Sequence, residues 1–314
     1  NHKDYGVTSE GVAVFLGKAL EAIREEKAER GEETTDHFTI KLTGGTDGDV
    51  AGNMLKILDR EYGARARVVG ICDATASAED ADGLPMDELL RLVHSGLPLK
   101  EFNAKRLGPN GELHFASTPE GARMRDTMHE RIEADAFVPA GGRPNTINAG
   151  NVDNFLRVDG APSSALICEA ANLFITPEAR QKLFEAGAFV IKDSSANKCG
   201  VICSSYEIIA SMMLSEEEFL QKKEQLVQDV LVRLRDAAAK EATLLLRERA
   251  RDPSVAPPMI SQRISGAITA AHDATLAALE GEMGSLDSAT EERMIRLAAQ
   301  KHLPEVLATP EMLD

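Results

Sequence analysis

An alternating segment, Phe38-Thr39-Ile40-Lys41-Leu42, runs directly into the glycine-rich segment Thr43-Gly44-Gly45-Thr46-Asp47-Gly48. Apolar and polar side chains alternate in the first segment as along a β-strand, and helical spacing of apolar residues resumes over 50–62. A glycine turn before a helix offers close backbone approach, free N–H groups and a positive dipole end to a pyrophosphate. Two residues separate Gly45 from Gly48, so the pattern is not GxGxxG. Taken alone, it also fits a plain turn between a strand and a helix.

An acidic residue follows the next expected strand, which spans residues 67–72. Asp73 lies 25 residues after Gly48, where a dinucleotide-binding fold places an acid on the adenosine ribose. A carboxylate there accepts hydrogen bonds from ribose hydroxyls and repels a 2′-phosphate. We therefore expect NAD rather than NADP as the cofactor. The alternative interpretation is that Asp73 merely caps the end of its strand.

Strands and helices alternate over roughly the first 200 residues, and helices alone follow. Further strands are expected at 136–138, 165–168 and 188–191, and further helices at 9–30, 85–94, 119–132, 177–185, 200–214, 216–251, 259–279 and 290–302. This order predicts an α/β Rossmann-type fold, a doubly wound and mostly parallel sheet followed by an all-helical C-terminal tail. We divide the chain into a dinucleotide-binding domain, 1–205, and a helical segment, 206–314. An apolar stripe in the tail either packs in the core or docks onto another domain; it comprises Leu226, Val227, Val230, Leu231 and Leu234.

Small and amide-bearing residues stand at the ends of the later strands. Pro139-Ala140-Gly141 and Glu169-Ala170-Ala171-Asn172 each follow a strand, and Asn197 comes shortly after the last one. Ligands of open α/β sheets bind outside the carboxyl ends of the strands. Small residues leave room for ribose and nicotinamide, and the two asparagines can donate and accept hydrogen bonds. Each asparagine alone could also be a turn former.

Charge and composition exclude several classes of function. The formal net charge of −16 disfavours nucleic acid and anionic membrane surfaces. No apolar run is long enough for a spanning helix. Small ligands and protein partners remain.

The cysteines and histidines give no indication of a metal. Four cysteines, Cys72, Cys168, Cys199 and Cys203, lie in apolar or small-residue segments, which favours reduced thiols in a reducing compartment: the cytoplasm or, in a eukaryote, the mitochondrial matrix. The seven histidines show no ligand-like spacing. Cys199 and Cys203, four residues apart on an expected helix, could bind a soft metal, but a buried helix face explains them better. We expect no metal.

Four groups of residues occur in the same order within residues 1–210 as in a known enzyme family. They are Tyr5-Gly-Val-Thr-Ser-Glu-Gly-Val, Thr43-Gly-Gly-Thr-Asp-Gly-Asp-Val-Ala-Gly-Asn, Glu169-Ala-Ala-Asn with Thr176-Pro-Glu-Ala, and Asn197-Lys-Cys-Gly-Val-Ile-Cys-Ser-Ser-Tyr-Glu. Together they resemble glutamate dehydrogenases, and the large, NAD-specific type fits better than the short hexameric type. Two departures add bulk near the cofactor: Cys199-Gly200 replaces a Gly-Gly pair, and Ala170 replaces a glycine.

The resemblance implies specific roles for the matching positions. The cofactor residues would be Thr8 at the nicotinamide carboxamide, Gly45, Gly48, Asp49 and Val50 at the pyrophosphate, Asp73 at the ribose, Ala140 and Gly141 at the strand end, and Asn172 and Asn197 at the nicotinamide ribose. Asn145 is a weaker match in a longer loop. Ser204 would reach the distal carboxylate of the substrate, with Val201 as its apolar neighbour.

The resemblance also implies the reaction and what surrounds this chain. In the family, L-glutamate is deaminated oxidatively to 2-oxoglutarate and ammonia with NAD, and a lysine and an aspartate of a preceding substrate domain transfer the protons. The chain begins Asn1-His2-Lys3-Asp4, so we expect a fragment cut from a longer polypeptide, inactive alone and homo-oligomeric at full length. No catalytic residue is assigned within it. The alternatives are a dehydrogenase of branched-chain or aromatic amino acids, which Ser204 disfavours, and a non-catalytic nucleotide-sensing module.

Overall fold

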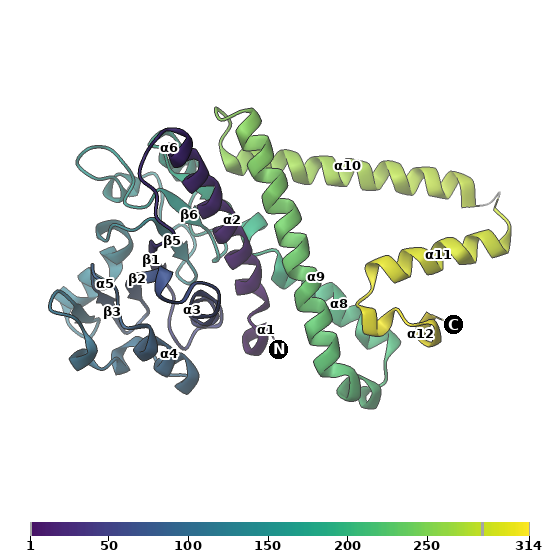
Figure 1. Ribbon diagram of the computed structural model, residues 1–314, viewed down its shortest axis with the longest axis horizontal. Helices are drawn as coiled ribbons and strands as arrows, with labels where there is room; N and C mark the ends of the chain where they lie inside the picture. The colour runs from purple at the N-terminus through teal and green to yellow at the C-terminus, as the bar shows by residue number, and fades with distance from the viewer. Residues whose placement is uncertain (1, 284–285, 314) are drawn as a thin grey trace.

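A computed structural model describes residues 2–283 and 286–313 and contains one seven-stranded sheet in the order β4-β3-β2-β1-β5-β6-β7 (Figure 1). The strands are β1 (Phe38–Thr43), β2 (Ala66–Cys72), β3 (Ala76–Glu79), β4 (Glu112–Phe115), β5 (Ala136–Pro139), β6 (Leu166–Cys168) and β7 (Phe189–Ile191). Strands β2, β1, β5, β6 and β7 run parallel to one another. The expected Rossmann-type sheet is confirmed.

Two strands at one edge of the sheet were not predicted. β3 pairs antiparallel with β2, and β4 pairs antiparallel with β3. Both are only four residues long, and β4 is partly exposed along its length. Neither has the apolar alternation of a longer strand, so the chain itself carries no signal for them.

Helices cover both faces of the sheet, as the doubly wound arrangement requires. They are α1 (His2–Tyr5), α2 (Val7–Glu29), α3 (Asp49–Tyr62), α4 (Met86–Ser95), α5 (Pro119–Arg131), α6 (Pro177–Glu185), α7 (Asp193–Ala196), α8 (Cys199–Met213), α9 (Glu216–Arg251), α10 (Pro257–Met283), α11 (Ser288–His302) and α12 (Pro310–Leu313). Ile40 and Val138 face the core that α2, α3 and α9 share. Phe137, one residue along β5, faces a second core with Leu183 of α6.

Capping residues set several helix boundaries. The Thr176 hydroxyl accepts from the Ala179 amide at the start of α6. Ser215 and Glu218 form a reciprocal capping box at the start of α9. These local bonds explain why the predicted limits of both helices agree with the structure.

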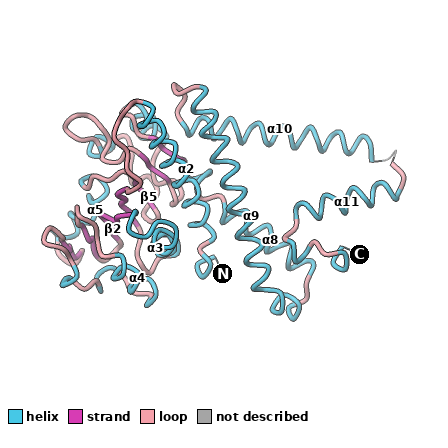
Figure 2. Tube along the Cα trace, viewed as in Figure 1, coloured by secondary structure: helices cyan, strands magenta, loops and turns pink. Residues whose placement is uncertain are grey.

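The helical tail packs on the α/β body through α9, which lies along α2, and then extends away from it (Figure 2). Leu226, Val230 and Leu234 of the apolar stripe are buried in the main core, so the core-packing interpretation is confirmed. α10 is exposed from Ser265 onward through the described part of the helix. The division at 205/206 stays a prediction, and it would fall inside α8. Over residues 2–283 and 286–313, every helix is too short or too polar to cross a membrane.

Candidate functional site

The order of the strands reverses between β1 and β5, and the chain around their carboxyl ends forms the candidate site. In the sheet, β2 lies beside β1 on one side, and β5 lies beside β1 on the other. The ends are held together: the Gly44 amide donates to the Cys72 carbonyl at 2.8 Å, and the Thr43 hydroxyl donates to the Gly141 carbonyl at 2.6 Å. A switch point of this kind is where open α/β sheets bind ligands.

Gly44 and Gly141 meet backbone to backbone at this point. Gly44 has a φ of +111°, a conformation that a side chain rarely adopts, and a β-carbon on Gly141 would lie 2.8 Å from the Gly44 Cα. Both positions therefore exclude side chains. The family resemblance implied Gly45 and Gly141 as cofactor residues but not Gly44, although the adjacent Gly44-Gly45 pair could have indicated it.

The helix after the turn begins without a side-chain cap. Gly48 is the N-cap of α3, and its amide donates to the Gly45 carbonyl at 2.9 Å. A β-carbon on Gly48 would lie 2.9 Å from that carbonyl oxygen, so the turn requires glycine here too. The first amides of α3, at Asp49 and Val50, have no partner within the helix. They form a ready site for an anion, although the Asp49 carboxylate adds a negative charge beside it.

Asp73 stands at the same edge as the glycine turn. A β-carbon on Gly45 would lie 3.2 Å from the Asp73 Cβ, so the turn and the acid are immediate neighbours. The Asp73 Oδ1 accepts from the Thr75 amide and hydroxyl, both at 2.6 Å, and from the Ala76 amide at 3.0 Å. Within residues 2–283 and 286–313, Oδ2 accepts only the Leu99 amide, at 2.7 Å. The carboxylate thus holds two loops, as the capping interpretation required, and Oδ2 keeps one lone pair for a further donor.

The two asparagines expected at the nicotinamide ribose lie together. The Asn197 amide group donates to the Asn172 Oδ1 at 2.7 Å and to the Ala170 carbonyl at 3.1 Å. The Ala170 and Ala171 amides both donate to the Pro139 carbonyl, which joins this loop to the end of β5. Residues of three separate segments therefore converge at this part of the sheet edge.

A buried ion pair that the sequence did not reveal holds the loop of Asn172. Glu169 accepts two hydrogen bonds from Arg180, at 2.7 and 3.0 Å, and one from the Ile175 amide. Burial raises the pKa of the Glu169 carboxyl to about 7, against the lowering effect of Arg180. Asp193 accepts from the Leu173 amide at 2.8 Å, and Leu173 has a φ of +58°. These contacts position the loop despite its backbone strain. Asn145, the weaker match, donates its amide to the Leu173 carbonyl at 2.7 Å.

Thr8 and the residues expected at the substrate meet at the first turn of α8. A β-carbon on Gly200 would lie 2.9 Å from the Thr8 Oγ1, so the start of α2 contacts α8 directly. Ser204 donates to the Gly200 carbonyl at 3.3 Å, one turn earlier on the same helix. Val201 is exposed. The roles of Val201 and Ser204 toward a substrate stay predictions.

The four cysteines are free and buried. Burial raises the pKa of Cys72 and Cys199 to about 12, so these thiols are protonated and unreactive at neutral pH. This agrees with the expectation of reduced structural thiols.

The chain resembles known proteins in both sequence and fold. It is 34% identical to the probable NAD-specific glutamate dehydrogenase of Schizosaccharomyces pombe, over 69% of this chain and 20% of that protein. It is 30% identical to the NAD-specific glutamate dehydrogenase of Neurospora crassa, over 85% of this chain and 26% of that protein. The chain thus spans about a fifth to a quarter of these relatives. Among solved structures, glutamate dehydrogenase 2 of Plasmodium falciparum has the same fold, with a TM-score of 0.59 and 18% identity over 91% of this chain and 54% of that one.

A family model also matches most of the chain. The model for Glutamate/Leucine/Phenylalanine/Valine dehydrogenase covers residues 1–255, which include the glycine turn, Asp73, both asparagines and α8. The match extends well beyond the sheet into α9. This chain therefore belongs to the Glutamate/Leucine/Phenylalanine/Valine dehydrogenase family.

Proposed function

We propose that this chain is the NAD-binding part of an oxidoreductase that deaminates L-glutamate to 2-oxoglutarate and ammonia. The observation that carries the proposal is the contact of Gly44 with Gly141 beside the uncapped start of α3, with Asp73 at the same edge. The names of the NAD-specific relatives support the cofactor and the substrate.

The residues at the edge fit a dinucleotide. The free amides at the start of α3 would hold the pyrophosphate, and the remaining lone pair of Asp73 Oδ2 would accept one ribose hydroxyl. The same carboxylate would repel the 2′-phosphate of NADP. Asn172 and Asn197 would orient the nicotinamide ribose, with Thr8 at the carboxamide. When bound, NAD⁺ supplies the hydride acceptor.

Other parts of the reaction are proposed to lie outside this chain. In this proposal an upstream substrate domain of the same polypeptide provides the lysine and the aspartate that transfer protons, and Ser204 and Val201 complete the pocket from this side. The full-length protein is proposed to be a homo-oligomer that acts without nucleic acid or membrane. This chain alone then binds NAD⁺ but turns nothing over.

Activity of the full-length polypeptide tests this function. We expect NADH formation with L-glutamate to exceed that with L-leucine, because the Ser204 hydroxyl suits a distal carboxylate better than an alkyl group. Ser204→Ala should raise KM for glutamate, whereas Ser205→Ala should not, since the Ser205 hydroxyl donates to the Ile202 carbonyl on an exposed face. Preferential oxidation of leucine would contradict the proposed substrate.

A further inference from the structure

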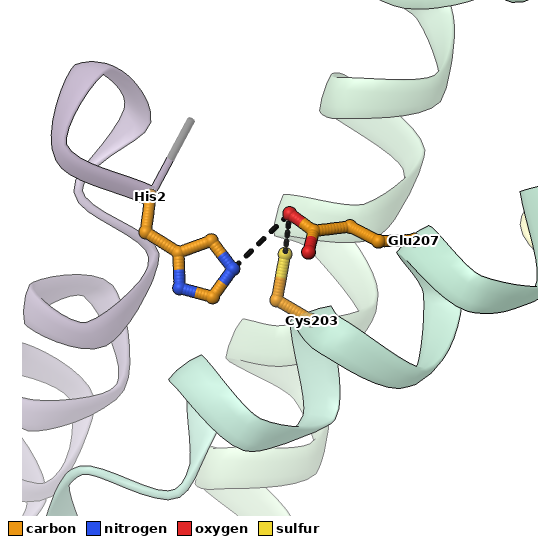
Figure 3. Close-up of side chains that lie close together, drawn as sticks. All are labelled: His2, Cys203 and Glu207. Carbon is orange, nitrogen blue, oxygen red and sulfur yellow. Dashed lines mark hydrogen bonds and ion pairs between the residues drawn. The ribbon is translucent and has the colours of Figure 1, made fainter. Parts of the chain in front are cut away.

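Three side chains able to bind a metal converge where α1 meets α8 (Figure 3). The His2 Nε2 lies 3.1 Å from the Glu207 Oε1, and the Cys203 Sγ lies 4.0 Å from that same oxygen. All three donor atoms lie within 4.8 Å of one another. Because His2 is about 200 residues from the other two in the sequence, only the fold brings them together.

The arrangement on α8 suits two ligands on one face. Cys203 and Glu207 are four residues apart on the same helix, so their side chains project in the same direction. The Cys199 thiol, one turn earlier, instead donates to the Leu234 carbonyl at 3.5 Å. The sequence favoured a buried helix face for Cys199 and Cys203 over a soft-metal pair; both are buried, and Cys203 also lies beside His2 and Glu207.

We propose that His2, Cys203 and Glu207 bind one divalent ion of the zinc class. Thiolate, imidazole and carboxylate are all zinc ligands, and three of them leave the fourth tetrahedral position open. Metal–ligand bonds of roughly 2.0–2.3 Å place the donor atoms of a tetrahedral site roughly 3.3–3.6 Å apart. Rotation of the side chains that shifts their donor atoms by about an ångström would therefore complete the site. A cavity of about 80 Å³, bordered by all three residues, leaves room for a water as the fourth ligand.

A bound divalent ion would balance the two negative charges of a thiolate and a carboxylate. Because a thiol loses its proton when it coordinates a metal, binding releases a proton and strengthens as the pH rises.

A metal here would join α1 to α8 beside the proposed nicotinamide end of the site. A β-carbon on Gly200 would lie 3.9 Å from the His2 Nδ1 and 2.9 Å from the Thr8 Oγ1, so one residue of the cluster and one cofactor residue both lie against Gly200. Occupancy would fix α8, and with it Ser204, relative to α1.

Titration of the untagged, metal-free chain with Co²⁺ tests the proposal. We expect one ion per chain and a near-ultraviolet thiolate-to-cobalt charge-transfer band that Zn²⁺ abolishes by competition. Cys203→Ser should lose the band, and His2→Gln and Glu207→Gln should each weaken Co²⁺ binding at least about tenfold, because loss of even an outer-shell partner of a ligand typically costs about 10–100-fold. Cys199→Ser is the matched control and should keep the band.

Unfolding temperatures measured with and without Zn²⁺ distinguish a variant that has lost the metal site from one that is misfolded. Zn²⁺ should raise the unfolding temperature of the wild-type chain and of Cys199→Ser, but not that of Cys203→Ser, because a ligand stabilises only a state that binds it. No band in the wild-type chain, or a band that survives Cys203→Ser, would overturn the proposal. Loss of the band in a folded Cys199→Ser chain would overturn it in favour of the cysteine pair.

Discussion

Gly44 and Gly141 bring the ends of β1 and β5 into direct backbone contact, so close that a β-carbon on Gly141 would lie 2.8 Å from the Gly44 Cα. This contact sits where the strand order reverses, beside the turn that starts α3. The shape of the cofactor edge depends on the absence of two side chains.

Gly141→Ala should therefore damage both stability and binding. The added methyl meets backbone rather than a movable side chain, so we expect about 1–3 kcal/mol of lost unfolding free energy, together with weaker NAD⁺ binding. Gly266→Ala is the matched control: in exposed α10, a β-carbon added there would meet no atom of the described residues within 4 Å, and a gain of roughly 0.5–1 kcal/mol in unfolding free energy is expected. Urea unfolding and calorimetry measure the two effects. Unchanged stability in Gly141→Ala would mean that the contact is not close.

Asp73→Asn should narrow the preference for NAD⁺ over NADP⁺. The substitution keeps the shape and one acceptor oxygen but removes the negative charge that repels a 2′-phosphate. NAD⁺ affinity should fall, and the ratio of NADP⁺ affinity to NAD⁺ affinity should rise above that of the wild-type chain. The exposed Asp236→Asn, whose partner is Lys240 on the same helix, should alter neither. A wider preference in Asp73→Asn would refute the role of this carboxylate.

Arg180→Met should lower the unfolding free energy of the chain more than a substitution on the exposed face of α6. It leaves the Glu169 carboxylate buried without its partner, which typically costs about 3–5 kcal/mol. Lys182→Met, also on α6, breaks only an exposed pair with Asp153 of the loop after β5 and should cost less than about 1 kcal/mol. The loop of Asn172 should also lose order, so NAD⁺ affinity should fall in the first variant alone. Equal stability of the two variants would show that the buried pair does not hold the loop.

His129 should make the chain less stable in mild acid. Burial, with the nearby Lys41 charge, lowers the pKa of His129 from 6.5 to about 4. Between these values the unfolded state binds a proton that the folded state excludes, so unfolding free energy falls as the pH falls, by up to about 1.4 kcal/mol per unit. His129→Leu should remove this slope in urea titrations at pH 7.5 to 5. The raised pKa of Glu169 has the opposite effect on stability. That effect is the same in the wild-type chain and in His129→Leu, so it cancels when the two pH profiles are compared. Parallel pH profiles would contradict the assignment.

The parallel strands, the long helices and the glycine–acid pairing could be predicted because each depends on the spacing of residues within a short segment. The burial of Lys41 could not be predicted in this way. Its place in an alternating strand suggests an outward polar side chain, yet it is fully buried, donating to the Ile132 carbonyl at 2.6 Å and to the Ser163 hydroxyl at 2.7 Å. Alternation within one strand does not say that a second layer covers the other face.

Contacts between distant segments were also beyond prediction. Asp73 was expected at a ribose, but its bond to the Leu99 amide depends on a loop 26 residues away. The same holds for His2 and Cys203, which no spacing in the chain relates. That these residues follow the ends of parallel strands could be predicted from the sequence, whereas the hydrogen bonds that hold them could not.

Calorimetric titration of this chain with NAD⁺ and NADP⁺, in the same buffer, tests the central claim most directly. We expect one NAD⁺ per chain, bound at least about tenfold more tightly than NADP⁺, a difference of about 1.4 kcal/mol in binding free energy. Equal affinity for the two dinucleotides, or no binding of NAD⁺, would contradict it.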